Sequence, residues 1–211
     1  MATYDLEEQE QIDSIKHFWT DYGRLVITGV VAFVLGVGGI QGWKYYTRTQ
    51  AKDASVEFGK LDEAVAKGDI IEIRNVGSDI VDRYPRTSYA PMAALVVAKA
   101  ERDAGDLDAA AGQLEWAAQN AASEEARMLS RLRLAGVLLD QEKYEEALKL
   151  LDEKVTEAFV ALYSDLRGDV LVERGKIPEA RAAYQQALDK SGESGGWRNV
   201  VQIKIDALGT P

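Results

Sequence analysis

The sequence has no cysteine and only one histidine, and these shortages exclude much of the chemistry that proteins use for catalysis and metal binding. Without cysteine there is no disulfide framework, no thiolate nucleophile and no cysteine-based zinc site. The one histidine, His17, lies in an acidic N-terminal tail, so the rest of the chain has neither a histidine metal site nor a Ser/His pair. Glycine motifs for phosphates or dinucleotides are also missing. We therefore expect no enzyme activity, no metal and no cofactor.

Basic residues are in the minority as well. The chain has 25 Lys and Arg against 35 Asp and Glu, which gives a formal net charge of −10. Because such a chain repels phosphates, we do not expect nucleic acid as a partner. Adjacent glutamates such as Glu124 and Glu125 fall at predicted helix starts, where negative charge interacts favourably with the helix dipole. We interpret them as structural rather than catalytic.

One stretch lacks charged residues altogether. It runs from Leu25 to Trp43, between Arg24 and Lys44. As a helix it would be roughly 28 Å long at 1.5 Å per residue, close to the ~30 Å hydrocarbon core of a bilayer. A helix satisfies its own backbone hydrogen bonds there. We predict an acidic tail over 1–24, a transmembrane helix over 25–43 and a soluble domain over 44–211.

Two other interpretations of this stretch fit the sequence less well. A cleaved signal peptide has a basic start and small residues at its cleavage site. Here the preceding tail is acidic, and the bulky residues Trp43 to Tyr46 follow the stretch. A buried core helix rarely has so long an uncharged run near the start of a chain. The aromatic residues at both ends suit the membrane–water interface, so a membrane anchor is favoured.

Two properties of the predicted span stay open. Within about 20 residues of it, two basic residues precede the span and three follow it, so the positive-inside rule does not decide the orientation. Gly38 and Gly42 have the spacing of a helix–helix packing face in the membrane. Glycine is common in membrane helices, so this spacing alone does not establish a dimer.

After the span, helical periodicity dominates and no alternating strand pattern competes with it. Ala54, Phe58, Leu61 and Val65 form an amphipathic stripe that ends at Gly68. Further helices alternate with short turns that contain Gly or Asp. We predict an all-α domain of helical hairpins at about 45–84, 87–121, 124–154 and 157–190, with a C-terminal capping helix over 196–208.

The hairpins share a pattern of small and large residues. A small residue at Ala98, Ala135 and Gly168 is followed 12 positions later by a second small residue, and 4 positions after that by a large one. This spacing resembles the tetratricopeptide repeat, a helix–turn–helix unit of about 34 residues that stacks into a solenoid. The positions expected in the core are Ala110, Ala147, Leu151, Ala180 and Tyr184. Those expected to cover the last hairpin are Trp197, Val200, Val201, Ile203 and Leu208.

In such solenoids the first helices of the hairpins line a concave surface that binds peptides or partner helices. Aligning the three clearest units places nine side chains near this surface, although any of them could instead pack against a neighbouring hairpin. The predicted groove is cationic in the first unit, aliphatic in the second and acidic in the third. Its residues are Met92, Lys99, Arg102, Leu129, Leu132, Leu139, Asp165, Asp169 and Val172.

The order of these parts resembles the YfgM family of bacterial inner-membrane proteins, which are ancillary subunits of the SecYEG translocon. The residues that carry the resemblance are Tyr4 to Glu10 (YDLEEQE), Gln11 to Trp19 (QIDSIKHFW) and the pair Gly42-Trp43. The resemblance implies a cytoplasmic N-terminus and a periplasmic repeat domain. It also implies partnership with SecYEG and the membrane-anchored prolyl isomerase PpiD, and a chaperone-like role towards exported proteins. It supplies no catalytic residues.

Two alternatives remain open at the level of sequence. The same architecture would suit an assembly scaffold of another envelope or secretion complex. It would also suit a tetratricopeptide adaptor that faces the cytoplasm. All three interpretations describe a membrane-anchored protein that binds other proteins rather than an enzyme.

Overall fold

The structure, a computed structural model, describes residues 6–192 and 196–209, with side chains from residue 11 onward. Residues 1–5 of the predicted tail, and with them part of the Tyr4 to Glu10 motif, lie outside the described residues. The described part contains nine helices and no strand, which confirms the all-α prediction. They are α1 (Leu6–Lys67), α2 (Ile70–Arg83), α3 (Tyr89–Asp103), α4 (Leu107–Asn120), α5 (Glu124–Asp140), α6 (Tyr144–Leu151), α7 (Glu157–Glu173), α8 (Ile177–Lys190) and α9 (Gly196–Ala207). The chain divides into two compact units, residues 1–49 and 50–211.

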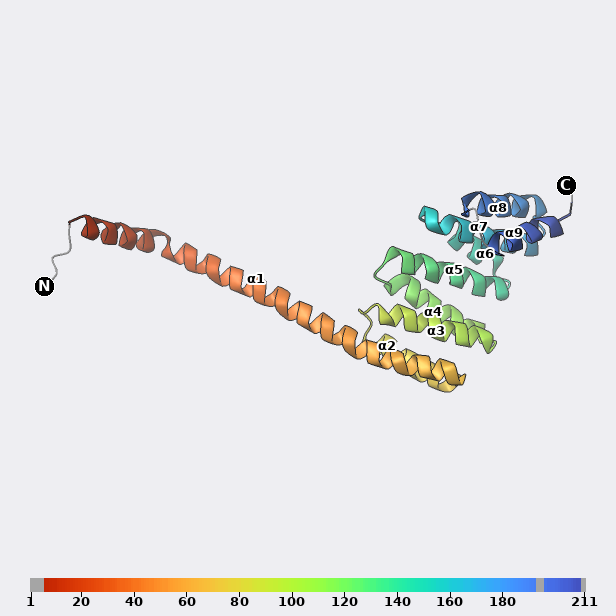
Figure 1. Cartoon of the computed structure of the whole chain (residues 1–211), viewed down its shortest axis with the longest axis horizontal. Coiled ribbons are helices and arrows are strands. Elements are labelled where there is room, and N and C mark those ends of the chain that lie inside the picture. The colour runs from red at the N-terminus through yellow and green to blue at the C-terminus, as the bar shows by residue number, and fades with distance from the viewer. Residues whose placement is uncertain (1–5, 193–195, 210–211) are drawn as a thin grey trace. The chain divides into compact units, whose positions relative to one another are not determined.

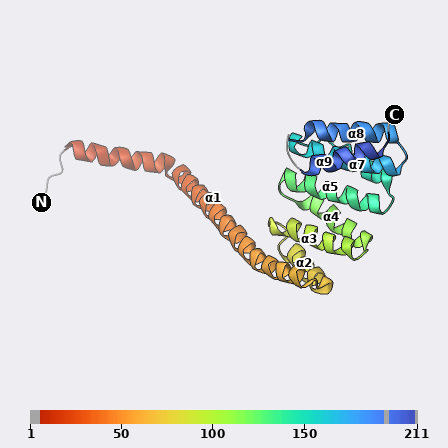
Figure 2. The same ribbon diagram turned by 45° about the vertical axis from the view of Figure 1, so that its right-hand side comes forward.

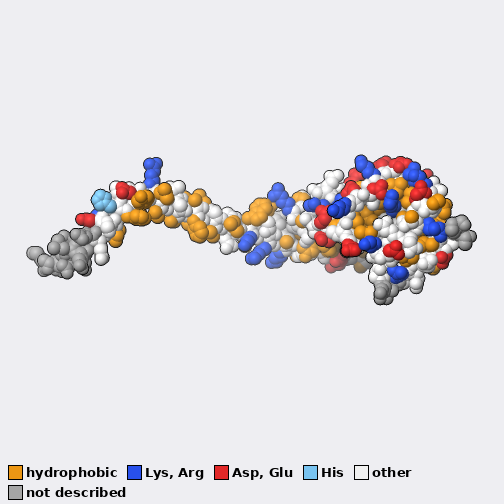
Figure 3. Space-filling view, turned by 90° about the horizontal axis from the view of Figure 1, so that it is seen from above, with side chains coloured by type: hydrophobic (Ala, Val, Ile, Leu, Met, Phe, Trp, Pro, Cys, Tyr) orange, Lys and Arg blue, Asp and Glu red, His pale blue; other side chains and the backbone are white. Residues whose placement is uncertain are grey.

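The first unit contains the greater part of α1. Its apolar side chains between residues 25 and 43 are exposed except for Val26, which is half-buried, and Figure 3 shows hydrophobic side chains over much of this stretch. No other part of the structure buries them, in contrast to the core helix of a soluble protein. The helix is long and apolar enough to cross a membrane.

The second unit consists of stacked helices (Figures 1 and 2). Consecutive helices from α2 to α9 pack on one another, and α5 also contacts α7. Small residues allow this close approach. A Cβ atom on Gly168 of α7 would lie 2.3 Å from the ring of Tyr184 on α8, and one on Gly77 of α2 would lie 2.2 Å from Val97 on α3. The five positions expected in the core are all buried.

The turns inside the four hairpins share one backbone geometry. In each, the N–H of the second or third residue after the helix donates to the carbonyl oxygen five residues earlier, as in Lys143 to Leu138 at 2.8 Å. The residue before that donor has a positive φ. It is a glycine in three of the turns, whereas Glu142 adopts φ 59° in the turn between α5 and α6. The side chains of Asp69, Asp106 and Ser123 then accept hydrogen bonds from the first turns of α2, α4 and α5.

Two interhelical contacts fix neighbouring hairpins. Arg74 of α2 forms an ion pair with Glu101 of α3, whose side chain is buried. The buried hydroxyl of Tyr163 on α7 donates a 2.7 Å hydrogen bond to the carbonyl oxygen of Met128 on α5. A buried charge and a buried hydroxyl each need such a partner, so these contacts hold α2 to α3 and α5 to α7 in register.

The C-terminal helix covers the last hairpin with three of the five residues predicted for this role. Val201 and Ile205 are buried against Tyr184 and its neighbours, with Trp197 and Leu208 partly buried beside them. The expectation for Val200 and Ile203 was wrong, since they are 49% and 66% exposed. The buried positions follow a helical stripe, and Val200 and Ile203 lie off it.

Candidate partner-binding groove

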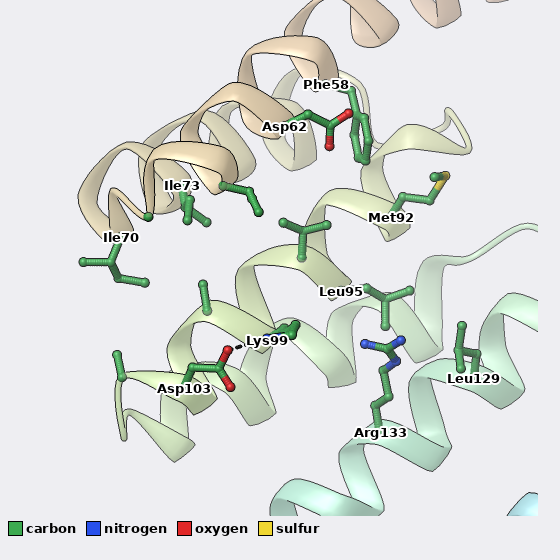
Figure 4. A pocket seen from close by; sticks show the side chains of 15 residues that line it. Phe58, Asp62, Ile70, Ile73, Met92, Leu95, Lys99, Asp103, Leu129 and Arg133 are labelled. Carbon is green, nitrogen blue, oxygen red and sulfur yellow. Dashed lines mark hydrogen bonds and ion pairs between the residues drawn. The ribbon is translucent and has the colours of Figure 1, made fainter. Parts of the chain in front are cut away.

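The main candidate site is a cavity on the first helices of the hairpins, within residues 58–133. The last turns of α1 form one wall, α3 lies in the middle and α5 forms the other wall (Figure 4). The cavity has a volume of about 730 Å³ and is open to solvent. A neighbouring cavity of about 180 Å³ lies between α3 and α5 and shares Leu95, Lys99, Asp103 and Arg133.

Most of the cavity wall is apolar. Phe58 of α1 packs against Tyr89 of α3 with ring centroids 5.6 Å apart and ring planes tilted by 50°, and it points towards the cavity in Figure 4. Met92 is 47% exposed, whereas Leu95 and Leu129 are partly buried. Large apolar side chains that keep contact with water in a concave site gain free energy when a ligand covers them.

Some charged side chains in and beside the cavity form ion pairs within the chain, and others do not. Lys99 forms an ion pair with Asp103 one helical turn away, and Arg102 pairs with Asp140 of α5. Asp62 on the α1 wall and Arg133 on the α5 wall have no ion-pair partner within the described residues. The two walls therefore present one uncompensated charge of each sign.

The nine predicted groove residues divide between this cavity and two other environments. Met92, Lys99 and Leu129 line the cavity, and Arg102 lines its smaller neighbour. Leu132 and Leu139 of α5 pack against the central hydrophobic core. Asp165 and Asp169 of α7 pair with Lys204 of α9 instead, and Val172 packs against the core formed by α7, α8 and α9. The role of the nine residues in partner binding stays a prediction.

The carboxylates of α7 are bound by the capping helix. Lys204 Nζ lies 2.8 Å from Asp165 Oδ1 and 2.7 Å from Asp169 Oδ1, and it sits 5.5 Å from the centre of the Tyr184 ring. The Tyr184 hydroxyl donates a 2.7 Å hydrogen bond to Asp169. We call these four residues the capped cluster. Within it, a cation from the same chain already neutralises the acidic end of the predicted groove.

Burial and hydrogen bonding shift two pKa values in the capped cluster. Burial, with a smaller contribution from the hydrogen bond to Asp169, raises the pKa of Tyr184 and keeps its hydroxyl protonated as a donor. Burial of Lys204 lowers its pKa, but hydrogen bonds to Asp165 and Asp169 outweigh this and leave the pKa raised. The lysine therefore stays charged where it neutralises both carboxylates.

Sequence reasoning missed the α1 wall and Arg133. Phe58 belongs to the amphipathic stripe that the sequence shows. The hairpin that contains Phe58 matches the repeat only weakly, so the repeat alignment does not predict that Phe58 lines the groove. Arg133 lies next to Leu132, and the two residues face different ways on α5. Leu132 packs against the core, whereas Arg133 reaches the cavity.

The remaining predicted features are placed as follows. Gly38 and Gly42 lie in the exposed part of α1, and a Cβ atom at either would meet no heavy atom within 4 Å, so a helix–helix face there stays a prediction. His17 is exposed. Across residues 11–192 and 196–209, no group of three or more His, Asp or Glu side chains is arranged to hold a metal ion.

The comparisons with known proteins agree with this architecture. The tetratricopeptide repeat-like domain family matches residues 16–210. A protein named ancillary SecYEG translocon subunit from Neisseria gonorrhoeae is 32% identical over 204 residues, covering 96% of this chain and 98% of that protein. Proteins of the same name from Haemophilus influenzae and Escherichia coli are 31% and 29% identical, over 90% and 99% of this chain and 93% and 99% of their own lengths. The N-terminal motifs indicate the same family. The chain belongs to the family of ancillary SecYEG translocon subunits.

Proposed function

We propose that this chain is a membrane-anchored adaptor that binds the SecYEG translocon and holds exported polypeptides as they emerge into the periplasm. The span over residues 25–43 anchors it in the bacterial inner membrane, with the N-terminus in the cytoplasm and the repeat domain in the periplasm. PpiD, a membrane-anchored prolyl isomerase, acts beside it. The names of the relatives support the translocon as partner.

The observation that carries the proposal is an open, mostly apolar cavity in the same chain as an exposed apolar helix of membrane-spanning length. The helix confines the repeat domain to the membrane surface, which raises its effective concentration near other membrane proteins. A cavity of modest affinity then suffices to hold a polypeptide for the short time before it folds. Binding by contact surfaces alone needs none of the catalytic groups that the sequence lacks.

Site-specific photocrosslinking in intact cells tests the proposal. A photoreactive residue in place of Met92 or Leu129, which line the cavity, should crosslink to exported proteins and to PpiD or SecYEG. The same residue in place of Gln186, which is exposed on α8, serves as the control. Crosslinks to the subunits of a different secretion complex would support the scaffold alternative and would contradict the proposal.

Two further measurements address the anchor and its orientation. A reporter fused to the C-terminus should be active only outside the cytoplasm, and activity inside would favour the cytoplasm-facing adaptor. The fragment 44–211, which lacks the span, should fold but co-purify with the translocon more weakly than the full chain. Equal co-purification would contradict the role given to the anchor.

A further inference from the structure

We propose that the cavity between α1, α3 and α5 binds an apolar polypeptide segment that carries one charge of each sign, with an acidic side chain of the segment at Arg133 and a basic one at Asp62. This inference rests on the proposed function, because it names the kind of segment that the same cavity holds. It adds a charge requirement to an otherwise apolar site.

The cation at Arg133 is the first part of the argument. Three cations meet between α3 and α5, but Lys99 and Arg102 are already paired with Asp103 and Asp140. Arg133 alone among them has no carboxylate partner in the described residues. Its guanidinium lies beside Leu95 and faces the cavity (Figure 4). A guanidinium next to apolar side chains binds a carboxylate through two parallel hydrogen bonds, and the apolar surroundings strengthen them.

The carboxylate at Asp62 is the second part. It projects from the α1 wall beside Phe58, on the side of the cavity opposite to Arg133 (Figure 4). Among the charged residues that line the cavity, Asp103 is held by Lys99, which leaves Asp62 as the carboxylate available to a cation of the ligand. A segment with charges of the same sign at both ends would place like charges together at one of the two walls.

The capped cluster removes a second possible binding site for the basic side chain of the segment. Asp165 and Asp169 would otherwise attract a basic side chain towards α7, but Lys204 binds both at 2.8 and 2.7 Å. A basic residue of the segment is therefore directed to Asp62 rather than to the far end of the helix stack. The apolar residues between the two charges lie against Phe58, Met92 and Leu129.

Binding of labelled peptides to the full chain in detergent micelles tests this directly. The probe is a peptide of twelve residues with a Leu-rich centre, Lys at one end and Glu at the other, measured by fluorescence anisotropy. Arg133→Glu should weaken its binding about tenfold. The same variant should bind more tightly a peptide in which Lys replaces the Glu. Lys154→Glu makes the same change of charge at an exposed loop residue away from the cavity and should leave both affinities unchanged.

The charge on the α1 wall is tested in the same way. Asp62→Lys should weaken binding of the original peptide and should bind more tightly a peptide in which Glu replaces the Lys. Circular dichroism of each variant confirms folding, which the exposure of both residues favours.

Several outcomes would overturn the inference. Equal affinity of the unmodified chain for the peptide with Lys and Glu and for the peptide with two Lys, or equal effects of Arg133→Glu and Lys154→Glu, would show that the cavity selects apolar residues without regard to charge. If crosslinks from Met92 to exported proteins persist in that case, only this inference fails and the proposed function stands. Failure of every peptide to bind, or occupation of the cavity by a second copy of the chain, would also overturn it.

Discussion

The cavity and the capped cluster use similar charged residues in opposite ways. In the capped cluster every charge has a partner from the same chain, since Lys204 lies between Asp165 and Asp169 and Tyr184 donates to one of them. In the cavity Arg133 and Asp62 stay unpartnered within the described residues, on walls that are otherwise apolar. In the capped cluster the charges stabilise the fold, whereas in the cavity they are available to a ligand. Substitutions in the capped cluster should therefore reduce stability, and substitutions of the cavity charges should reduce ligand binding.

The largest expected effect concerns the helix packing beneath the capped cluster. Gly168→Ala would place a Cβ atom 2.3 Å from the Tyr184 ring, which its hydrogen bond to Asp169 holds in place. Either the ring must turn and lose that bond, or α7 and α8 must separate. We expect the free energy of unfolding to fall by about 3 kcal/mol. Urea titration of the full chain in detergent micelles, followed by far-UV circular dichroism, measures it.

Gly112→Ala is the matched control for this substitution. Gly112 is also helical, but it is exposed and a Cβ atom there would meet no heavy atom within 4 Å. Alanine restricts the unfolded chain more than glycine does, so this variant should be more stable by up to about 1 kcal/mol. If Gly168→Ala proved as harmless as Gly112→Ala, close packing would not explain the small residue at this position.

This packing is the part of the fold that the sequence predicted best. The pairing of Gly168 with a large residue 16 positions later follows from the small–large pattern, and Tyr184 is buried as expected. The ion pair between Asp165 and Lys204 could not be predicted in the same way. It depends on Lys204, which is 39 residues away and belongs to a helix outside the repeat pattern. Periodicity shows which side chains face outward, but it does not show which distant residue meets them.

The second prediction compares the two charged sites directly. Lys204→Met keeps the length of the side chain but leaves Asp165 and Asp169 close together without a cation. Both carboxylates are partly buried, with side chains 15% and 30% exposed. We expect a loss of about 2 kcal/mol, less than for a fully buried pair. The amide hydrogens of α9 should exchange faster, because the helix loses its polar contact with α7.

Arg133→Gln is the counterpart in the cavity. Since Arg133 is exposed and has no ion-pair partner in the described residues, its loss should change the free energy of unfolding by less than about 0.5 kcal/mol. Similar losses for the two variants in the same urea titration would remove the distinction between a stabilising cluster and a free binding site.

The third prediction concerns the contact between α5 and α7, which lies between the two sites. Tyr163→Phe removes the 2.7 Å hydrogen bond to the Met128 carbonyl and should cost about 1 kcal/mol at neutral pH. Burial raises the pKa of Tyr163 to about 12, against a lowering by Arg131. The folded state therefore binds the phenolic proton more tightly than the unfolded state does.

The direction of the pH dependence follows from this raised pKa. The contribution of Tyr163 to stability is complete below pH 10, where the unfolded phenol is protonated, and it is lost as the pH rises towards 12. Tyr163→Phe should therefore lose less stability than the unmodified chain between pH 9 and pH 11. Parallel losses in the two proteins over this range would show that Tyr163 does not keep its proton in the folded state.

The smallest expected effect is a gain in stability at the one hairpin turn that lacks glycine. Glu142 has the same backbone hydrogen bonding as the glycines at the other three turns, and its φ of 59° costs an L-residue about 1 kcal/mol. Glu142→Gly relieves this but increases the freedom of the unfolded chain, so the net gain should be about 0.5 kcal/mol.

Glu115→Gly, at an exposed site within α4, makes the same change of residue where the backbone is helical, and it should cost about 1 kcal/mol. Opposite signs for the two variants in urea titration would show that turn geometry governs the effect. A loss at both would mean that Glu142 makes a favourable contact that outweighs its backbone conformation.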